Sequence, residues 1–157
     1  MMKYYISAFA MAALFAVVSC NDATFEGKQD LPQSQWIRKN PITFDFEIKD
    51  PLPTYEISYG VRYGNSYPYY NLYVRYELKD EAGNSLQGKM NQTNLFEPET
   101  GQPLGKGIGD LYEQEVVLIP SYRFAANGKY KLSIFQYMRP DTLTHVYAVM
   151  IKVRPLK

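Results

Sequence analysis

The chain has 157 residues, with one Cys, one His and 15 Tyr, and 15% of its residues are aromatic. Its formal charge is only +1, so it lacks the basic excess that nucleic-acid phosphates attract, and no nucleic-acid partner is expected. A single Cys and a single His argue against a Cys/His metal site or a Cys/His nucleophile. No cofactor, metal or small-molecule substrate is predicted, and the length suits one domain.

Residues 1–19 are predicted to be a lipoprotein signal peptide. Lys3 is their only charge, and the apolar run at residues 6–18 is too short to span a bilayer but has the length of a secretory signal core. Val17-Val18-Ser19-Cys20 resembles the bacterial lipoprotein signal, in which the chain is cut before the Cys and the thiol carries fatty-acyl chains such as palmitate. Cys20 is therefore the predicted lipidation site; the alternative is an ordinary signal peptide with an incidental Cys.

This anchor predicts a location in the cell envelope, because more than one acyl chain holds a protein stably on a membrane. Asn21 follows the Cys, where Asp would indicate retention at the inner membrane, so the outer membrane is favoured.

Residues 20–40 are predicted to form a lipidated tether. They are mostly polar, contain Pro32, and show neither a strand period nor a helix period. Trp36 and Ile37 are expected to pack the end of the tether onto the domain, which is predicted to span residues 41–157. Fully extended, the fifteen residues to Gln35 would reach about 50 Å.

The domain shows strand-like alternation of apolar and polar residues. About seven such segments are visible, at residues 42–48, 55–63, 72–78, 86–90, 111–119, 130–134 and 146–150. Turn residues and prolines separate them, and no stretch of ten residues has a convincing helical period. The pattern predicts an all-β fold, an antiparallel β-sandwich of immunoglobulin-like or jelly-roll-like order.

Two details of this pattern can be compared with a structure. Asn127-Gly128-Lys129-Tyr130 resembles the corner of immunoglobulin-like sandwiches, where a Tyr hydroxyl bonds back to the preceding backbone. In the last segment Val146, Ala148 and Met150 are expected on the buried face.

Few residues suggest chemistry. The Gly-rich run at residues 105–110 is followed by a strand-like segment and not by the helix that a phosphate cradle needs, so a flexible or tightly turned loop is expected. Asp110, Glu113 and Glu115 lack the spacing of a calcium loop. The protein is therefore predicted not to be an enzyme, since a hydrolase would need a pocket that joins His145 to a Ser and a carboxylate.

Tyr69, Tyr70, Tyr73 and Arg139 form the candidate partner or ligand surface. Tyr combines a rigid apolar ring with a polar tip, which suits a binding surface and equally the rim of a core. A shallow groove lined by the three Tyr residues would indicate a carbohydrate ligand, whereas a broad apolar or mixed patch would indicate a protein partner.

Several segments together resemble the gliding-motility lipoprotein family GldH. They are Cys20 with its signal, Leu31-Pro32 before Trp36, and residues 41–50, 67–73, 101–110, 128–130 and 136–139. The resemblance implies a small envelope lipoprotein needed for surface gliding, a machinery linked to type IX protein secretion, with other motility or secretion proteins as partners. It brings no catalytic residues. We therefore expect a non-enzymatic, lipid-anchored interaction subunit; the alternative is a carbohydrate-binding envelope module.

Overall fold

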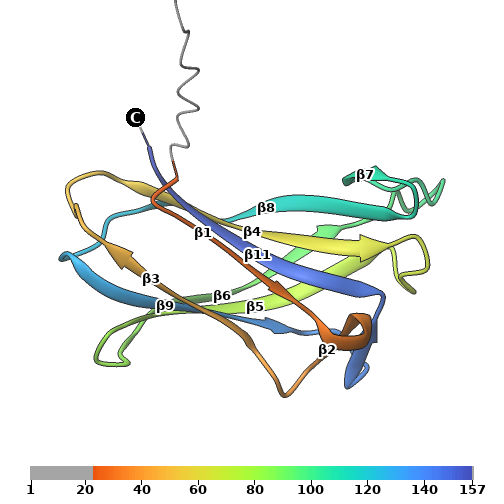
Figure 1. Cartoon of the computed structure of the whole chain (residues 1–157), viewed down its shortest axis with the longest axis horizontal. Coiled ribbons are helices and arrows are strands. Elements are labelled where there is room, and N and C mark those ends of the chain that lie inside the picture. Colours follow the sequence, from red (N-terminus) through yellow and green to blue (C-terminus); the bar gives the residue numbers. More distant parts are fainter. Residues whose placement is uncertain (1–22, 157) are drawn as a thin grey trace, which may run out of the picture.

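The computed structural model describes residues 23–156, which form strands and one short 3-10 helix. In chain order the elements are β1 (Phe25–Asp30), η1 (Pro32–Ser34), β2 (Gln35–Ile37), β3 (Ile42–Ile48), β4 (Tyr55–Gly64), β5 (Asn71–Asp80), β6 (Ser85–Asn94), β7 (Lys106–Ile108), β8 (Leu111–Tyr122), β9 (Gly128–Gln136), β10 (Thr142–Thr144) and β11 (Val146–Pro155). Two sheets face each other (Figure 1), with strand orders β1-β11-β4-β8-β7 and β3-β9-β5-β6. β10 pairs with β2 in a separate ribbon.

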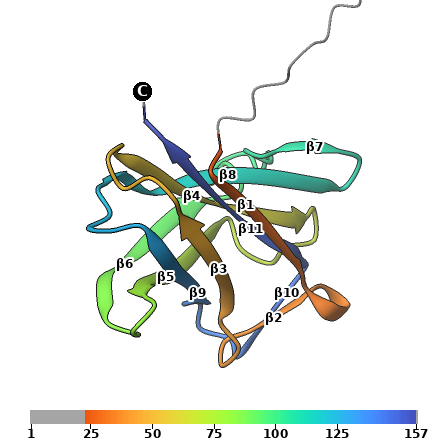
Figure 2. The same ribbon diagram turned by 60° about the vertical axis from the view of Figure 1, so that its left-hand side comes forward.

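All of these pairings are antiparallel, which confirms the predicted all-β sandwich. Figure 2 shows the two layers from a second direction. The described residues contain eleven strands, whereas the sequence predicts about seven. Three of the additional strands, β2, β7 and β10, have only three residues each, which is too short for a period of two to be visible.

The core lies between the two sheets and follows the predicted alternation. In β3 the even-numbered residues from Ile42 to Ile48 are buried, and β5 buries Leu72, Val74, Tyr76 and Leu78 in the same way. In β4 the alternate residues from Tyr55 to Tyr63 are buried as well, but so are Ser58 and Gly60, which a period of two places on the opposite face of the strand. Neighbouring strands cover this outer face: a Cβ atom on Gly60 would lie 3.0 Å from Met150 Cε.

Residues 25–37 were predicted to lie in the tether at residues 20–40, but they form β1, η1 and β2 of the folded domain. β1 pairs with β11 from Phe25 opposite Val153 to Asp30 opposite Ala148. Trp36 in β2 is only 1% exposed, so it is a core residue, whereas its neighbour Ile37 is 41% exposed. β1 lies at the edge of its sheet and holds its place through backbone hydrogen bonds, which the side-chain pattern does not reveal.

A bulge in β11 makes the predicted buried face of the last segment wrong at Met150, whereas Val146 and Ala148 are buried as predicted. The strand pairs Val146 with Tyr63 and then Ala148 with Arg62, so the register shifts by one residue. The core side chains that follow are Val149, Ile151 and Val153. A one-residue shift moves every later side chain to the other face of the sheet, which places Met150 on the outside.

The sandwich has two ends, between which all the long strands run. At the proximal end the described chain begins at Ala23 and finishes at Leu156, and the loops after β3, β5 and β8 gather there (Figure 1). At the distal end lie the β4–β5 loop, the β9–β10 loop, the β7–β8 hairpin and the β2–β10 ribbon. Strands of ten residues at about 3.3 Å per residue separate the two ends by about 33 Å.

The predicted tyrosine corner is present at the proximal end. The Tyr130 hydroxyl donates a hydrogen bond to the carbonyl oxygen of Ala126 at 2.7 Å, and the ring stacks on Phe46. The bond connects the β8–β9 loop to the start of β9.

Candidate functional site

The structure brings Tyr73 beside Tyr137, a residue that the sequence analysis did not select. The backbone N–H of Tyr137 donates to the carbonyl oxygen of Tyr73 at 2.8 Å, and both side chains are exposed, by 36% and 56%. The two residues are 64 positions apart in sequence, so only the pairing of β5 with β9 places them together. We call Tyr69, Tyr70, Tyr73, Tyr137 and Arg139 the distal tyrosine surface.

Arg139 lies on a loop that two buried or half-buried side chains hold in shape. The Arg38 guanidinium donates to the carbonyl oxygens of Met138 and Arg139. Gln136, which is fully buried, accepts from the Met138 N–H at 2.8 Å and donates to the Pro140 carbonyl at 3.0 Å. The Arg139 side chain is exposed and forms no ion pair with any residue in the range 23–156. A charged side chain on a braced loop is available to a partner.

Tyr69 and Tyr70 lie in the β4–β5 loop, at the same end of the sandwich. Tyr69 packs edge-on against Tyr67, which is buried and donates its hydroxyl to the Asn71 carbonyl at 2.9 Å. The Tyr70 carbonyl accepts from the backbone N–H groups of Leu95 and Phe96. Tyr69 is 38% exposed and Tyr70 is 49% exposed. Buried aromatic rings therefore support the exposed ones, so the core-rim and binding-surface interpretations both describe part of this segment.

The hollow at the distal tyrosine surface is lined by Arg38, Tyr137, Met138 and Arg139, and Tyr69, Tyr70 and Tyr73 are not among its lining residues. The exposed side chains of the distal tyrosine surface combine tyrosine rings with one guanidinium group.

The β7–β8 hairpin presents a second exposed apolar group at the distal end. Ile108 at its tip is 93% exposed, and Leu111 is 40% exposed. Gly109 has φ +64°, the left-handed conformation that such a turn requires, and Asp110 accepts a backbone bond from Asn65 at 2.9 Å. The loop predicted at residues 105–110 is present only in part, because Lys106–Ile108 form strand β7 and the tight turn lies at Gly109 and Asp110. Sequence analysis missed Ile108, although an Ile between two glycines in a turn is a visible signal.

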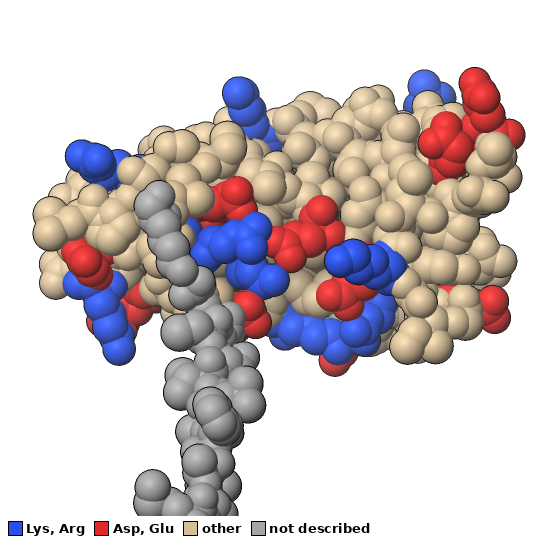
Figure 3. All heavy atoms as spheres, turned by 90° about the horizontal axis from the view of Figure 1, so that it is seen from above, with Lys and Arg blue, Asp and Glu red and all other residues tan. Residues whose placement is uncertain are grey.

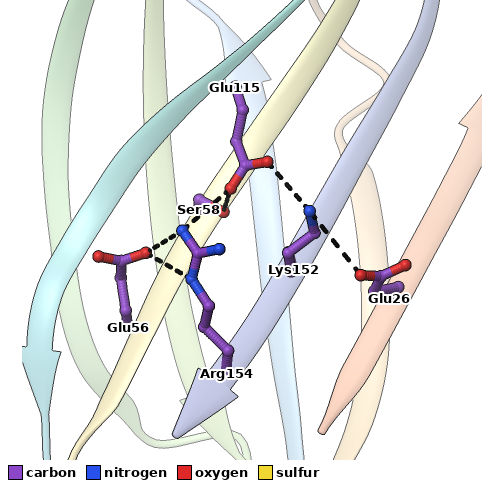
Figure 4. A network of polar contacts seen from close by, with 6 residues as sticks. All are labelled: Glu26, Glu56, Ser58, Glu115, Lys152 and Arg154. Atoms are coloured by element: carbon purple, nitrogen blue, oxygen red, sulfur yellow. Dashed lines mark hydrogen bonds and ion pairs between the residues drawn. The ribbon is translucent and has the colours of Figure 1, made fainter. Parts of the chain in front are cut away.

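The outer face of the β1-β11-β4-β8-β7 sheet carries interspersed charges of both signs (Figure 3). At its centre Arg154 contacts Glu56 at 2.5 Å and Glu115 at 3.3 Å (Figure 4). Lys152 contacts Glu115 at 3.1 Å and Glu26 at 3.8 Å. Each charge therefore has an opposite partner, and this face does not present the single-sign field that attracts a charged ligand.

Glu115 is the acceptor at the middle of this network. Burial alone would raise its pKa, but hydrogen bonds from Ser58 and Lys152 outweigh the burial and hold the pKa below its usual value. The Ser58 hydroxyl donates to one carboxylate oxygen at 2.8 Å. A hollow of about 290 Å³ lies alongside, with Gly60 and Met150 in its lining. Within this network Glu56, Glu115, Lys152 and Arg154 each have a partner of opposite charge.

The remaining candidates for chemistry are not brought together. His145 sits at φ +60° between β10 and β11, where its carbonyl accepts from the Gly64 N–H at 3.0 Å. Within residues 23–156, no group of three or more His, Cys, Asp and Glu residues could hold a metal ion. In the same range, no helix is long and apolar enough to cross a membrane. Cys20 and the predicted signal peptide lie outside the described residues.

Known proteins resemble this chain over most of its length. The family model described as GldH lipoprotein matches residues 23–153. A gliding motility lipoprotein GldH homolog of Christiangramia forsetii is 30% identical over 107 residues, which cover 68% of this chain and 65% of that protein. Gliding motility lipoprotein GldH of Flavobacterium johnsoniae is 24% identical over 138 residues, which cover 88% of this chain and 84% of that protein. The chain thus spans just under two thirds of the first of these relatives.

Solved structures resemble it only distantly. An arabinose-bound α-L-arabinofuranosidase has a TM-score of 0.39 at 11% identity, over 74% of this chain and 17% of that one. The VP2 subviral particle of infectious bursal disease virus has a TM-score of 0.37 at 14% identity, over 96% of this chain and 37% of that chain. Likenesses at this level carry no information on function.

Proposed function

The chain belongs to the GldH lipoprotein family, and from this membership we propose that it is a non-enzymatic, lipid-anchored subunit of the envelope machinery for gliding motility and type IX secretion. Acylation of Cys20 holds it on the outer membrane. It acts by binding other motility or secretion proteins through its distal tyrosine surface.

One observation carries the interaction role: the exposed aromatic side chains gather at the end of the sandwich opposite the chain's entry. The described chain starts at the proximal end, where Thr24 lies four positions after Cys20 in the sequence. The distal tyrosine surface lies about 33 Å away along the strands. A protein anchored at one end presents the other to its surroundings, and Tyr and Arg are the residue types that dominate the energetics of protein interfaces.

The paired charges of the outer sheet support the same proposal. The polar network around Glu115 is internally satisfied, so its charges are less available to a partner than the exposed side chains of the distal tyrosine surface. The tyrosine rings, by contrast, have apolar faces that remain open to solvent.

In-cell photocrosslinking tests this role. A photoreactive phenylalanine analogue at Tyr70 or Tyr137 is expected to capture envelope proteins. The matched control carries the same analogue at Asn127, which is exposed at the proximal end. Capture of glycan without protein at the distal positions would support the carbohydrate-binding alternative, and equal capture at Asn127 would contradict a specific distal surface.

A further inference from the structure

Two exposed leucines lie close together at the proximal end, and neither the fold nor the distal surface explains them. Leu52, in the β3–β4 loop, is 80% exposed, and Leu156, just after β11, is 40% exposed. The backbone N–H of Leu156 donates to the Thr54 carbonyl at 2.7 Å, so the two segments are adjacent. Two apolar side chains therefore project from one small region of this end.

The loop that carries Leu52 is held in shape by hydrogen bonds at its base. The Leu52 N–H donates to the Asp50 carboxylate at 3.0 Å, and the Tyr55 hydroxyl donates to the Asp50 carbonyl at 2.5 Å. The Tyr55 side chain itself is buried in the core. The Asp50 carboxylate is thus turned back onto the loop, while the Leu52 side chain points into solvent on a fixed support.

The end of β11 connects this loop to the start of the described chain. The Thr24 N–H donates to the Val153 carbonyl at 2.8 Å, and Pro155, two residues further along β11, pairs with Tyr55 at the end of the loop. Thr24 lies four positions after Cys20 in the sequence. Since each residue spans at most about 3.6 Å, Cys20 lies within roughly 14 Å of Thr24. A lipid attached to Cys20 therefore keeps the β3–β4 loop close to the bilayer.

We propose that Leu52 and Leu156 insert into the lipid leaflet that holds Cys20, so that the sandwich stands on its proximal end. The inference rests on the proposed acylation of Cys20. Apolar side chains on a surface loop are stabilised at the boundary between head groups and acyl chains. Lys49, exposed beside the loop, can face anionic head groups, and it forms no ion pair with another residue of the described chain. This contact fixes the orientation of the domain, which the acyl chains alone do not.

Depth-dependent fluorescence quenching tests the contact in the full acylated chain. Cys20 is the only cysteine, and acylation consumes its thiol, so Leu52→Cys provides a single reactive thiol for an environment-sensitive fluorophore. The labelled protein is placed in vesicles of phosphatidylethanolamine and phosphatidylglycerol. The matched control is Ile108→Cys, at the 93% exposed tip of the distal hairpin. Spin-labelled lipids are expected to quench the probe at position 52 at least two-fold more strongly than the probe at 108, and aqueous iodide is expected to quench it less.

Flotation of the vesicles separates failure of the anchor from failure of the contact. If the labelled protein does not float, or if Cys20→Ala floats equally well, the proposed lipid anchor at Cys20 is refuted. The proposed leucine contact, which depends on that anchor, is then refuted as well. If the protein floats in a Cys20-dependent way and the two probes are equally accessible to iodide, the anchor stands and the leucine contact is refuted. Quenching at 52 that needs an added protein and not lipid would also refute the lipid contact.

Discussion

Replacing Trp36 by Ala measures whether the segment before residue 41 is part of the core or part of a tether. The Trp36 side chain is 1% exposed, and its indole N–H has no hydrogen-bond partner among the described residues, so the loss is one of apolar burial. A buried aromatic side chain removes about 150–250 Å² from water, which at about 25 cal/mol/Å² gives an upper bound of about 4–6 kcal/mol. Aromatic-to-Ala substitutions in cores cost about 3–5 kcal/mol, and we expect this range.

Urea unfolding followed by far-ultraviolet circular dichroism is the assay. For a slope of about 2 kcal/mol per molar urea, the midpoint should fall by about 1.5–2.5 M. Ile37→Ala is the matched control, because Ile37 is the next residue of β2 and is 41% exposed; it should cost less than about 1 kcal/mol. Trp36→Phe keeps an aromatic ring and allows the comparison if the Ala variant does not fold. Equal losses at positions 36 and 37 would refute the placement of β2 in the core.

Three further outcomes are expected. Tyr59→Phe should leave stability unchanged or raise it by up to about 1 kcal/mol in the same urea assay, because the buried hydroxyl, whose pKa burial raises, has no partner among the described residues; a loss above 1 kcal/mol would reveal an unrecognised bond. Tyr130→Phe should cost about 0.5–1.5 kcal/mol, because its hydroxyl bonds the Ala126 carbonyl, and no loss would show that this corner is dispensable. Glu115→Gln should cost at most about 1 kcal/mol at pH 7, since the pair is partly exposed. A lowered carboxylate pKa adds stability above the unfolded-state value of 4.5 and loses it as the pH falls through the folded-state value, so wild type and variant should converge once the pH is below the folded-state pKa of Glu115; a constant difference would contradict the lowered pKa.

The candidate site was predictable only in part. Tyr69, Tyr70 and Tyr73 lie in one short Tyr-rich segment of the sequence, and this local enrichment makes them recognisable as a candidate surface. Tyr137 lies beside Tyr73 because β5 pairs with β9, and the sequence around Tyr137 does not indicate this contact. Leu52 could not be selected either, because an apolar residue between two prolines suggests only a loop until its exposure is known.

The fold class and the buried faces of β3 and β5 follow from the sequence alone. Alternation with period two is a local property, and each side chain there faces the core because its own strand has one buried side. The prolines and turn residues likewise mark the boundaries of strands through local backbone restrictions.

Tertiary structure alone decided the places where a strand depends on its neighbour. β1 is nearly all exposed along its length and is a strand because β11 supplies its hydrogen-bond partners. The bulge after Val146 reverses the faces of β11, and the antiparallel order sends the exposed tyrosines and the start of the described chain to opposite ends. These features arise from contacts between residues far apart in sequence, whose free energy appears only once both partners are in place.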